Sequence, residues 1–392
     1  MKNLSVKTND FKESIIRGMT RMAVKYNALN LSQGFPEFMP PKEILDRLER
    51  VSHDGRFQQY PIGHGAINTR EALTKKHKKF TGIDFDHETE VVITCGGTEA
   101  MATTILTLCD KGDKIVAFSP LYENYKTQCA MAGVELLDVK LDPNNNYNFD
   151  ANELEDCLKN NDVKAIILCN PSNPCGKVFT LEEMTIIANL AKKYDLYVIT
   201  DEVYEHIVFD DNKMVYMASL PDMRERTICC GSLSKTYSIT GWRIGYIFAP
   251  KEIMNSMKKV HNFLTIASPA PLQEAITVGL NFEQQYYDNL LNLYTTNRNI
   301  LLDGFDTLGI KYNKPQGTYF MLIDLGEYLQ KSGATNELEF AEMLCQKVGV
   351  CFVPCESFFT QKTNGIFRIH FAKNKDTLYE TLNRLEKLKQ VF

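Results

Sequence analysis

The stretch from 227 to 246, TICCGSLSKTYSITGWRIGY, decides how the rest of the chain is interpreted. It opens with an apolar run, typical of a buried strand, and passes into small polar residues that end the strand. Lys235 then lies where the edge of a parallel sheet opens into a crevice. Poor hydration there favours the neutral amine, which can attack an aldehyde and form a Schiff base. Ser232, Ser234 and Arg243 would add hydrogen-bond donors and one fixed positive charge, which suits a phosphate.

A second strand pattern upstream favours this interpretation over a simpler one. Taken alone, Lys235 could be a surface residue, because most lysines are exposed and Ser-x-Ser-Lys is common in loops. Residues 196–200, LYVIT, also form a buried-strand pattern, and Asp201 follows them directly. Pyridoxal phosphate requires such a pair, since the lysine holds its aldehyde and the carboxylate keeps its ring nitrogen protonated.

The same residues carry a resemblance to a known family. The run SLSKTYSITGWRIGY (232–246), preceded by TDEVYEHIVF (200–209), resembles the class I and II aminotransferases of pyridoxal-phosphate fold type I. It is most similar to the branch that holds kynurenine, glutamine and methionine aminotransferases. Matching motifs run from LSQGFPEF (31–38) to FRIHFA (367–372), so the resemblance covers almost the whole chain. It implies an α/β fold with a large domain and a smaller α+β domain.

The order of the patterns supports that architecture independently. Strand patterns alternate with helical ones from about 90 to 250, which predicts a mostly parallel sheet covered by helices on both faces. A long helical pattern at 283–308, ended by Gly309, predicts a bridge to the small domain. An earlier helical pattern runs from Phe11 to Tyr26. The expected division is a large cofactor-binding domain at 45–285 and a small domain made of 1–44 and 286–392.

Composition excludes several other classes of protein. The chain has 392 residues, 44% of them hydrophobic and 24% charged, which is ordinary for a globular protein. Its formal net charge is −5, and no basic run is long enough for a nucleic-acid surface. No apolar stretch approaches the roughly 20 residues of a membrane helix, and the N-terminal residues lack the apolar core of a secretory signal.

Cysteine usage favours a cytoplasmic location. The 11 cysteines have no metal-like spacing, which favours reduced thiols over disulfides or zinc ligands. Cys169, Cys229 and Cys230 lie in apolar strand patterns and are interpreted as small buried hydrophobic residues.

A glycine turn between a strand pattern and a helical pattern is expected to help hold the phosphate. Residues 91–94 form the strand pattern, CGGT (95–98) the turn, and an apolar helical pattern follows. The glycines could simply make the turn, but this context favours an anion site at a helix N-terminus. The resemblance assigns Gly97 and Thr98 to the phosphate. Glu99 would be unfavourable beside a dianion, so we expect its side chain to point outward.

The resemblance also implies an aromatic residue on the cofactor ring. By the family pattern Tyr122 lies flat on the pyridine, where an aromatic face adds stacking. A core tyrosine is the rival interpretation, and an error of register would transfer the role to Leu121 or Tyr125.

Further residues are assigned by the resemblance alone. Asn173, in NPSNPCG (170–176), would contact the ring hydroxyl and the substrate carboxylate, and Tyr204 would hydrogen-bond the ring oxygen. Cys175 stands where family members usually have Thr or Leu, a harmless difference. Tyr60 would reach the phosphate of the neighbouring subunit, which implies a homodimer.

Two more residues would contact the substrate. Gly34 lies in a turn, SQGFP (32–36), that in the family passes over the cofactor; without the resemblance it could be an ordinary turn. Arg368 lies in the alternating strand pattern 366–371 and would share a face with His370. A strand arginine usually faces water, but by resemblance Arg368 binds the substrate α-carboxylate in a bidentate fork. His64 is left out of the catalytic set.

These assignments predict transamination from an L-amino acid to a 2-oxo acid by a ping-pong mechanism. Lys235, freed by the incoming substrate, would move the Cα proton as a general base and acid. The expected side chains are apolar, aromatic, or of the methionine or glutamine type. Two alternatives remain: a carbon–sulfur β-lyase of the cystathionine type on the same fold, and a non-catalytic regulatory relative. Neither nucleic acid nor membrane is expected as a partner, and no metal is expected.

Overall fold

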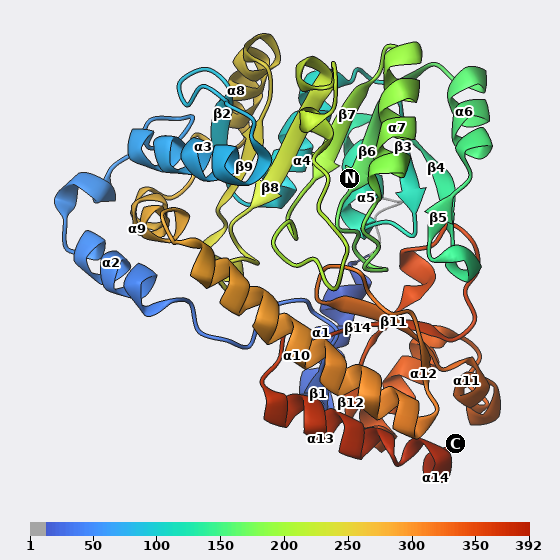
Figure 1. Ribbon diagram of the computed structural model, residues 1–392. Coiled ribbons are helices and arrows are strands. Elements are labelled where there is room, and N and C mark those ends of the chain that lie inside the picture. Colours follow the sequence, from blue (N-terminus) through green and yellow to red (C-terminus); the bar gives the residue numbers. More distant parts are fainter. Residues whose placement is uncertain (1–12) are drawn as a thin grey trace, which may run out of the picture.

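The computed structural model describes residues 13–392, which are built around two sheets (Figure 1). In the larger sheet, four successive pairs are parallel, whereas β9 runs antiparallel to both of its neighbours and β5 antiparallel to β4. This confirms the expectation of a mostly parallel sheet. In spatial order its eight strands are β2 (Val91–Thr94), β9 (Gly245–Phe248), β8 (Thr227–Ser232), β7 (Tyr197–Asp201), β6 (Val163–Cys169), β3 (Lys114–Ser119), β4 (Glu135–Asp142) and β5 (Asn148–Phe149).

Helices cover both faces of this sheet because successive strand residues point to opposite sides. On β8, Ile228 and Cys230 pack into one core cluster, whereas Cys229 packs into another. The first face is covered by α4 (Gly97–Leu108), α5 (Glu123–Ala132) and α8 (Lys251–Thr265). The second face is covered by α3 (Ile67–Thr81), α6 (Ala151–Asn160), α7 (Leu181–Lys193) and α9 (Ala270–Leu280), and α2 (Lys42–Ser52) packs against α9.

The smaller sheet is antiparallel and lies below the larger one in Figure 1. Its strands, in spatial order, are β10 (Lys311–Tyr312), β11 (Phe320–Asp324), β14 (Ile366–His370) and β13 (Val353–Pro354). Near it, β1 (Leu29–Asn30) pairs in parallel with β12 (Val350–Cys351), which brings segments more than 300 residues apart in the sequence side by side. The helices on this side are α1 (Ile15–Lys25), α11 (Gly326–Ser332), α12 (Glu337–Met343), α13 (Lys375–Leu385) and α14 (Leu388–Val391).

Helix ends follow from local sequence. The long helix α10 (Gln284–Leu308) runs diagonally past both sheets and ends at Gly309, whose left-handed φ of 72° suits glycine (Figure 1). Thr180 and Glu183 form the capping box that starts α7. The first helix begins at Ile15, and Phe11, with which the expected pattern began, lies outside the described residues.

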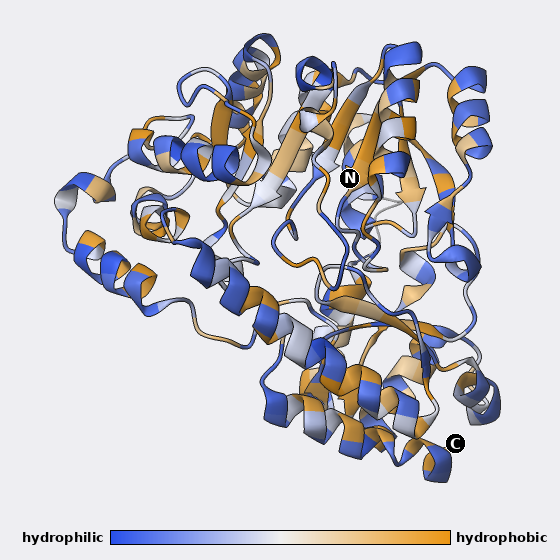
Figure 2. Cartoon of the chain, viewed as in Figure 1, coloured by the Kyte–Doolittle hydropathy of each residue, from blue (hydrophilic) through white to orange (hydrophobic). Residues whose placement is uncertain are grey.

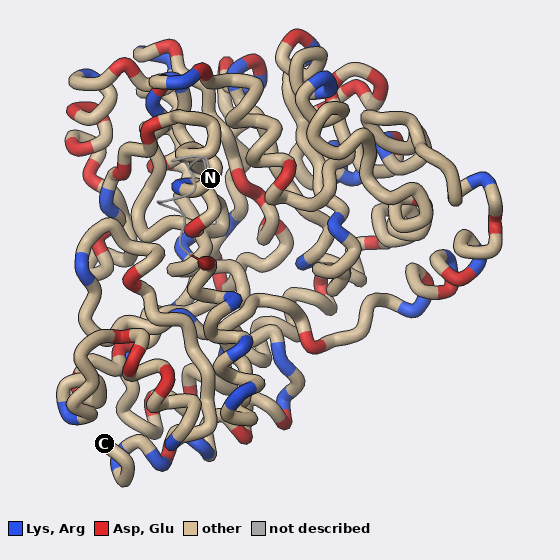
Figure 3. Tube along the Cα trace, turned by 180° about the vertical axis from the view of Figure 1, so that it is seen from behind, with Lys and Arg blue, Asp and Glu red and all other residues tan. Residues whose placement is uncertain are grey.

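The distribution of side chains is that of a globular protein. Figure 2 shows hydrophobic strands inside and hydrophilic residues on the outer sides of the surrounding helices. Lys and Arg positions are interspersed with Asp and Glu along the chain (Figure 3). Among residues 13–392, no helix has the length and apolar character needed to cross a membrane.

Candidate active site

The predicted lysine and aspartate come together where β7 and β8 end. Asp201 is the last residue of β7 and pairs in register with Cys230 of β8, while Lys235 follows β8 by three residues. Each of the two side chains shifts the pKa of the other through its charge. The Lys235 Nζ donates a hydrogen bond of 2.7 Å to the carbonyl oxygen of Gly34, from the turn near the N-terminus.

The surroundings of Lys235 make its amine unusually acidic. Burial, followed by the positive charges of Arg368 and Arg243, lowers the pKa of Lys235 from 10.5 to about 7, and the carboxylate of Asp201 partly opposes this. A large share of the amine is therefore neutral near pH 7. Such an amine can act as a nucleophile and can accept a proton.

Asp201 is buried and already oriented by two donors. The hydroxyl of Tyr125 donates to its Oδ2, and the backbone N–H of Val203 donates to its Oδ1 at 3.2 Å. Burial raises the pKa of Asp201 despite these bonds and the charge of Lys235. A cationic group in the site would offset that cost, which fits a carboxylate meant to face a protonated ring nitrogen.

The structure also distinguishes Tyr122 from Leu121 and Tyr125, the two residues to which an error of register would transfer its role. The hydroxyl of Tyr125 is engaged by Asp201, and the side chain of Leu121 packs in the apolar core. The ring of Tyr122 stands edge-on to that of Tyr125, with centroids 5.7 Å apart. Burial raises the pKa of Tyr122 to about 12, and Arg368, Asp201 and other site charges act on it as well. This favours Tyr122 as the residue that faces the cofactor ring.

A cradle of donors lies between the start of α4 and the segment after β8. A Cβ atom added to Gly96 would lie 2.3 Å from a guanidinium nitrogen of Arg243, so glycine lets the two approach. Gly97 begins α4, and a Cβ there would be 3.5 Å from the Cβ of Ser232. The Ser232 hydroxyl is also 2.8 Å from that of Ser234. A helix N-terminus, an arginine and two hydroxyls make a fitting phosphate site.

The expectation for Glu99 was wrong. Its carboxylate points inward and accepts hydrogen bonds from the Thr103 hydroxyl at 2.9 Å and the backbone N–H of Cys95 at 2.6 Å. It also lies 2.8 Å from the Nδ1 of His261, on α8. Burial acts to lower the pKa of His261, but the hydrogen bond and charge of Glu99 raise it overall. Two residues near it in the sequence and a histidine 162 positions away thus bind this carboxylate.

Arg368 is buried, at 1% exposure, and does not face water. Its Nη1 donates to the Oδ1 of Asn173 at 2.8 Å and its Nη2 to the carbonyl oxygen of Ser32 at 3.0 Å, whereas the buried Nε has no partner. The guanidinium lies 4.1 Å from the ring centroid of Phe320 and 4.8 Å from that of Phe358. An unpaired donor in so enclosed a place is suited to a carboxylate from a ligand.

Gly34 and Tyr204 join the site through Tyr319, which the sequence did not single out. The Tyr319 hydroxyl donates to the Gly34 carbonyl at 2.9 Å, the same oxygen that Lys235 binds. The ring of Tyr319 stands edge-on to that of Tyr204, at 5.2 Å. A Cβ on Gly34 would lie 2.3 Å from the ring of Phe320, so this turn requires glycine.

Two predicted residues lie at the margin. Thr98 is exposed at the start of α4, and Tyr60, on the connection between α2 and α3, is 83% exposed. That connection lies at the edge of the molecule in Figure 1. Burial lowers the pKa of His64 to about 4, so its ring is neutral near pH 7.

The fold and this site define an enzyme that uses pyridoxal phosphate. The sequence pattern described as aminotransferase class I and II matches residues 26–385. The chain belongs to this family of pyridoxal-phosphate-dependent transaminases.

Similar proteins support the assignment over the full length. The structure of N-succinyldiaminopimelate aminotransferase from Mycobacterium tuberculosis is 33% identical and matches with a TM-score of 0.92, over 99% of this chain and 100% of that one. That of a methionine aminotransferase from Escherichia coli is 30% identical, with a TM-score of 0.92 and the same coverage. Human kynurenine–oxoglutarate transaminase 1 is 30% identical over 398 residues, 94% of each chain.

Proposed function

We propose that this aminotransferase takes its amino group from L-amino acids with apolar, aromatic, methionine-type or glutamine-type side chains. The observation that carries the proposal is Arg368, whose unpaired Nε lies in an enclosure walled by Phe320 and Phe358. Lys235 and Arg243, the other two cations whose charges meet in this site, already have other roles in it. The similarity to aminotransferases for methionine and kynurenine points to the same side-chain classes.

The residues present fit pyridoxal phosphate. The cradle of Gly96, Gly97, Ser232 and Arg243 is positive and rich in donors, and a Cβ on Gly96 would fill it. The near-neutral amine of Lys235 suits an aldehyde. When bound, the cofactor supplies an aldehyde that carries the amino group and a ring that withdraws electrons from the substrate Cα.

The chain's own residues then have distinct tasks. We propose that Asp201, oriented by Tyr125, balances the charge of the ring nitrogen, and that Tyr122 covers one face of the ring. Tyr204 and Asn173 donate hydrogen bonds to the ring oxygen. The phosphate is bound by residues from two strand ends and by one from the neighbouring subunit: Gly97, Thr98, Ser232, Arg243 and the partner's Tyr60.

Two residues act on the substrate itself. Arg368 binds its α-carboxylate in a bidentate fork that includes the free Nε, while Asn173 holds the guanidinium in place at 2.8 Å. Gly34 brings its backbone over the same space. The neutral amine of Lys235 would accept the proton from Cα and, once protonated, deliver it to the former aldehyde carbon of the bound cofactor, so its low pKa sets the lower pH limit of turnover.

The proposal extends to the organisation of the molecule. The division into a large domain at 45–285 and a small one at 1–44 plus 286–392 is supported by α10, which begins beside the larger sheet and continues past the smaller one (Figure 1). A homodimer is supported by the exposed side chain of Tyr60. A cytoplasmic location is supported by the 11 cysteines, none of which forms a disulfide.

A substrate panel tests the proposal. Initial rates are measured for methionine, glutamine, phenylalanine, kynurenine, aspartate and glutamate as donors, each with several 2-oxo acids. We expect the neutral donors to exceed aspartate in kcat/KM, since Arg368, Lys235 and Arg243 already have tasks in the proposed site. A marked preference for aspartate would refute the side-chain class. Pyruvate and thiol released from a cysteine conjugate without any 2-oxo acid would instead indicate the β-lyase.

A further inference from the structure

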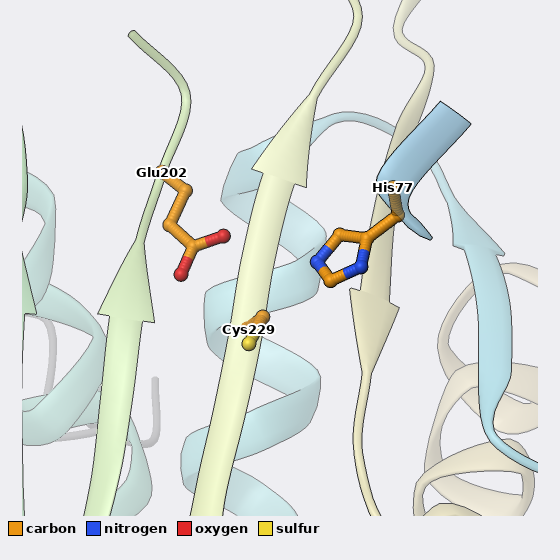
Figure 4. A group of neighbouring side chains, drawn as sticks. All are labelled: His77, Glu202 and Cys229. Carbon is orange, nitrogen blue, oxygen red and sulfur yellow. The ribbon is translucent and has the colours of Figure 1, made fainter. Parts of the chain in front are cut away.

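A second polar cluster is buried on the face of the large sheet opposite Asp201. Glu202 comes directly after Asp201 and therefore points to the other side of the sheet. It meets Cys229, from the neighbouring strand β8, and His77, from α3 (Figure 4). One nitrogen, oxygen or sulfur atom from each of these three buried residues lies within 4.8 Å of the other two. The enzymatic reaction uses none of them.

The hydrogen bonds of His77 show that its free nitrogen is an acceptor. Its Nδ1 lies 3.1 Å from the hydroxyl of Thr81, while that hydroxyl donates to the backbone oxygen of His77 at 2.8 Å. Because the hydroxyl proton is engaged there, Nδ1 carries the ring proton and Nε2 has a free lone pair. The buried Nε2 has no partner.

The carboxyl group of Glu202 also keeps an unpaired oxygen. Its Oε1 accepts from the Thr200 hydroxyl at 2.7 Å, but the buried Oε2 has no hydrogen-bond partner. Burial, followed by the charge of Glu205, raises the pKa of Glu202 to about 8, so without a cation this group keeps its proton near pH 7. The neighbouring Glu205 differs, because Lys76 binds it at 2.8 Å and the hydroxyl of Tyr216 at 3.1 Å. Glu202 thus lacks the cation that its neighbour has.

We propose that His77, Glu202 and Cys229 bind one Zn²⁺ ion in the core of the large sheet. Imidazole, thiolate and carboxylate are all zinc ligands, and the thiolate disfavours Mg²⁺ and Ca²⁺. A thiolate and a carboxylate balance the charge of a divalent ion, so the loaded site is neutral, as burial requires. Both oxygens of Glu202 on the metal would complete four-coordination. The Thr81 hydroxyl would fix the tautomer of the His77 ring.

The geometry requires a small adjustment. Zinc bonds of about 2.0–2.3 Å place the ligand atoms roughly 3.5 Å apart, so these side chains must close by about 1 Å. Cys229 and Glu202 must also lose their protons, because burial, the largest cause for both, raises the pKa of the thiol well above its usual value and that of the carboxyl group to about 8. Metal coordination deprotonates a thiol, so the ion itself supplies this change.

The ion would tie α3 to the two strands that carry the active site. Glu202, one ligand, directly follows Asp201 at the end of β7, and β8, which carries Cys229, leads into Lys235. Spacing in the sequence gives no sign of this site, because the three residues come from distant segments and Cys229 lies in an apolar strand pattern.

The test measures metal on the intact holoenzyme. The protein is expressed with added Zn²⁺ and passed over a chelating resin, and zinc per chain is determined by plasma mass spectrometry. We expect about one zinc per chain, with one sulfur at about 2.3 Å in the zinc X-ray absorption spectrum. Cys229→Ala should lower the zinc content about tenfold or more.

Cys230→Ala is the matched control. Cys230 is the next residue on β8 and equally buried, but it faces the other side of the sheet, toward Thr104. This variant should keep the zinc of the wild type. The proposal is overturned by wild-type holoenzyme with no zinc, by equal zinc in Cys229→Ala, or by bound zinc without a sulfur ligand. The last readout needs no variant, so it holds even if Cys229→Ala fails to fold.

Discussion

At the scale of the residue, the chemistry rests on where one lysine is placed. Lys235 is buried among the charges of Arg368 and Arg243, which lower its pKa, and the charge of Asp201 partly offsets them. These groups arrive from three separate segments of the chain, so the reactive amine is a property of the fold. The same enclosure leaves the Nε of Arg368 as a donor without an acceptor.

The pH dependence of cofactor uptake should report this pKa. The rate at which the apoprotein takes up pyridoxal phosphate, followed by absorbance, should rise with pH through about 7 and then level off, because only the neutral amine reacts. Asp201 raises the pKa of Lys235, so Asp201→Asn should move the midpoint to lower pH. A rate that keeps rising toward pH 10.5, the ordinary lysine value, would show that burial does not act as described.

Replacement of Arg368 should impair substrate binding specifically. Arg368→Ala should lower kcat/KM by a factor that corresponds to a loss of about 2–5 kcal/mol of transition-state stabilisation, the range for removing one partner of a desolvated charge pair. Arg368→Lys should not restore activity, because lysine cannot form the bidentate fork. Arg298→Ala is the control, since Arg298 is also buried and lies 4.4 Å from the ring centroid of Phe209. If both alanine variants lose kcat/KM equally per folded enzyme, the effect comes from packing.

Much of this site could be predicted from the sequence, but its supporting contacts could not. Lys235 and Asp201 lie in motifs whose position after a strand has a chemical meaning. Tyr125 was named only as a register rival of Tyr122, and its bond to Asp201 depends on how α5 packs. The expectation for Glu99 failed because its partner, His261, is on a distant helix. Short-range patterns carry no information about such pairs.

At the scale of the element, the phosphate cradle depends on glycine between a strand and a helix. Gly96 has a φ of +83° and leaves room for Arg243. The order and type of the elements were predictable, because apolar runs and capping residues are local signals. The antiparallel direction of β9 was not, since it depends on the path of the chain after Lys235.

Gly96→Ala, compared with a control glycine, should distinguish the loss of space for Arg243 in the phosphate cradle from the backbone strain of alanine at a positive φ. The added Cβ would lie 2.3 Å from Arg243, so cofactor affinity should fall about tenfold or more, measured by titration of the apoprotein. Gly82→Ala is the control, because Gly82 also has a positive φ, of 75°, but open space around it. It should cost about 1 kcal/mol of stability and leave affinity unchanged. Equal loss of affinity in both variants would contradict the cradle.

At the scale of the whole molecule, one residue of the proposed site lies apart from the rest. Tyr60 is exposed on the connection between α2 and α3, as a residue that serves a second subunit should be. The sequence suggested this only through family resemblance, because nothing local marks an interface.

Mixed dimers can test whether Tyr60 of one chain completes the active site of the other. Tyr60→Ala and Lys235→Ala should each be nearly inactive as homodimers at limiting cofactor. Coexpressed, they should regain activity, because one site then combines Lys235 of one chain with Tyr60 of the other. Purification by two different tags isolates the mixed species. Activity no higher than that of the two parent dimers would place Tyr60 in its own chain's site or outside any site.

The most direct test of the account is to find the lysine that carries the cofactor. The holoenzyme is reduced with borohydride, digested, and sequenced by mass spectrometry. The account predicts the pyridoxyl group on Lys235, and no labelled peptide in Lys235→Ala. A label on another buried lysine, such as Lys373, or a holoenzyme with no labelled lysine, would contradict it.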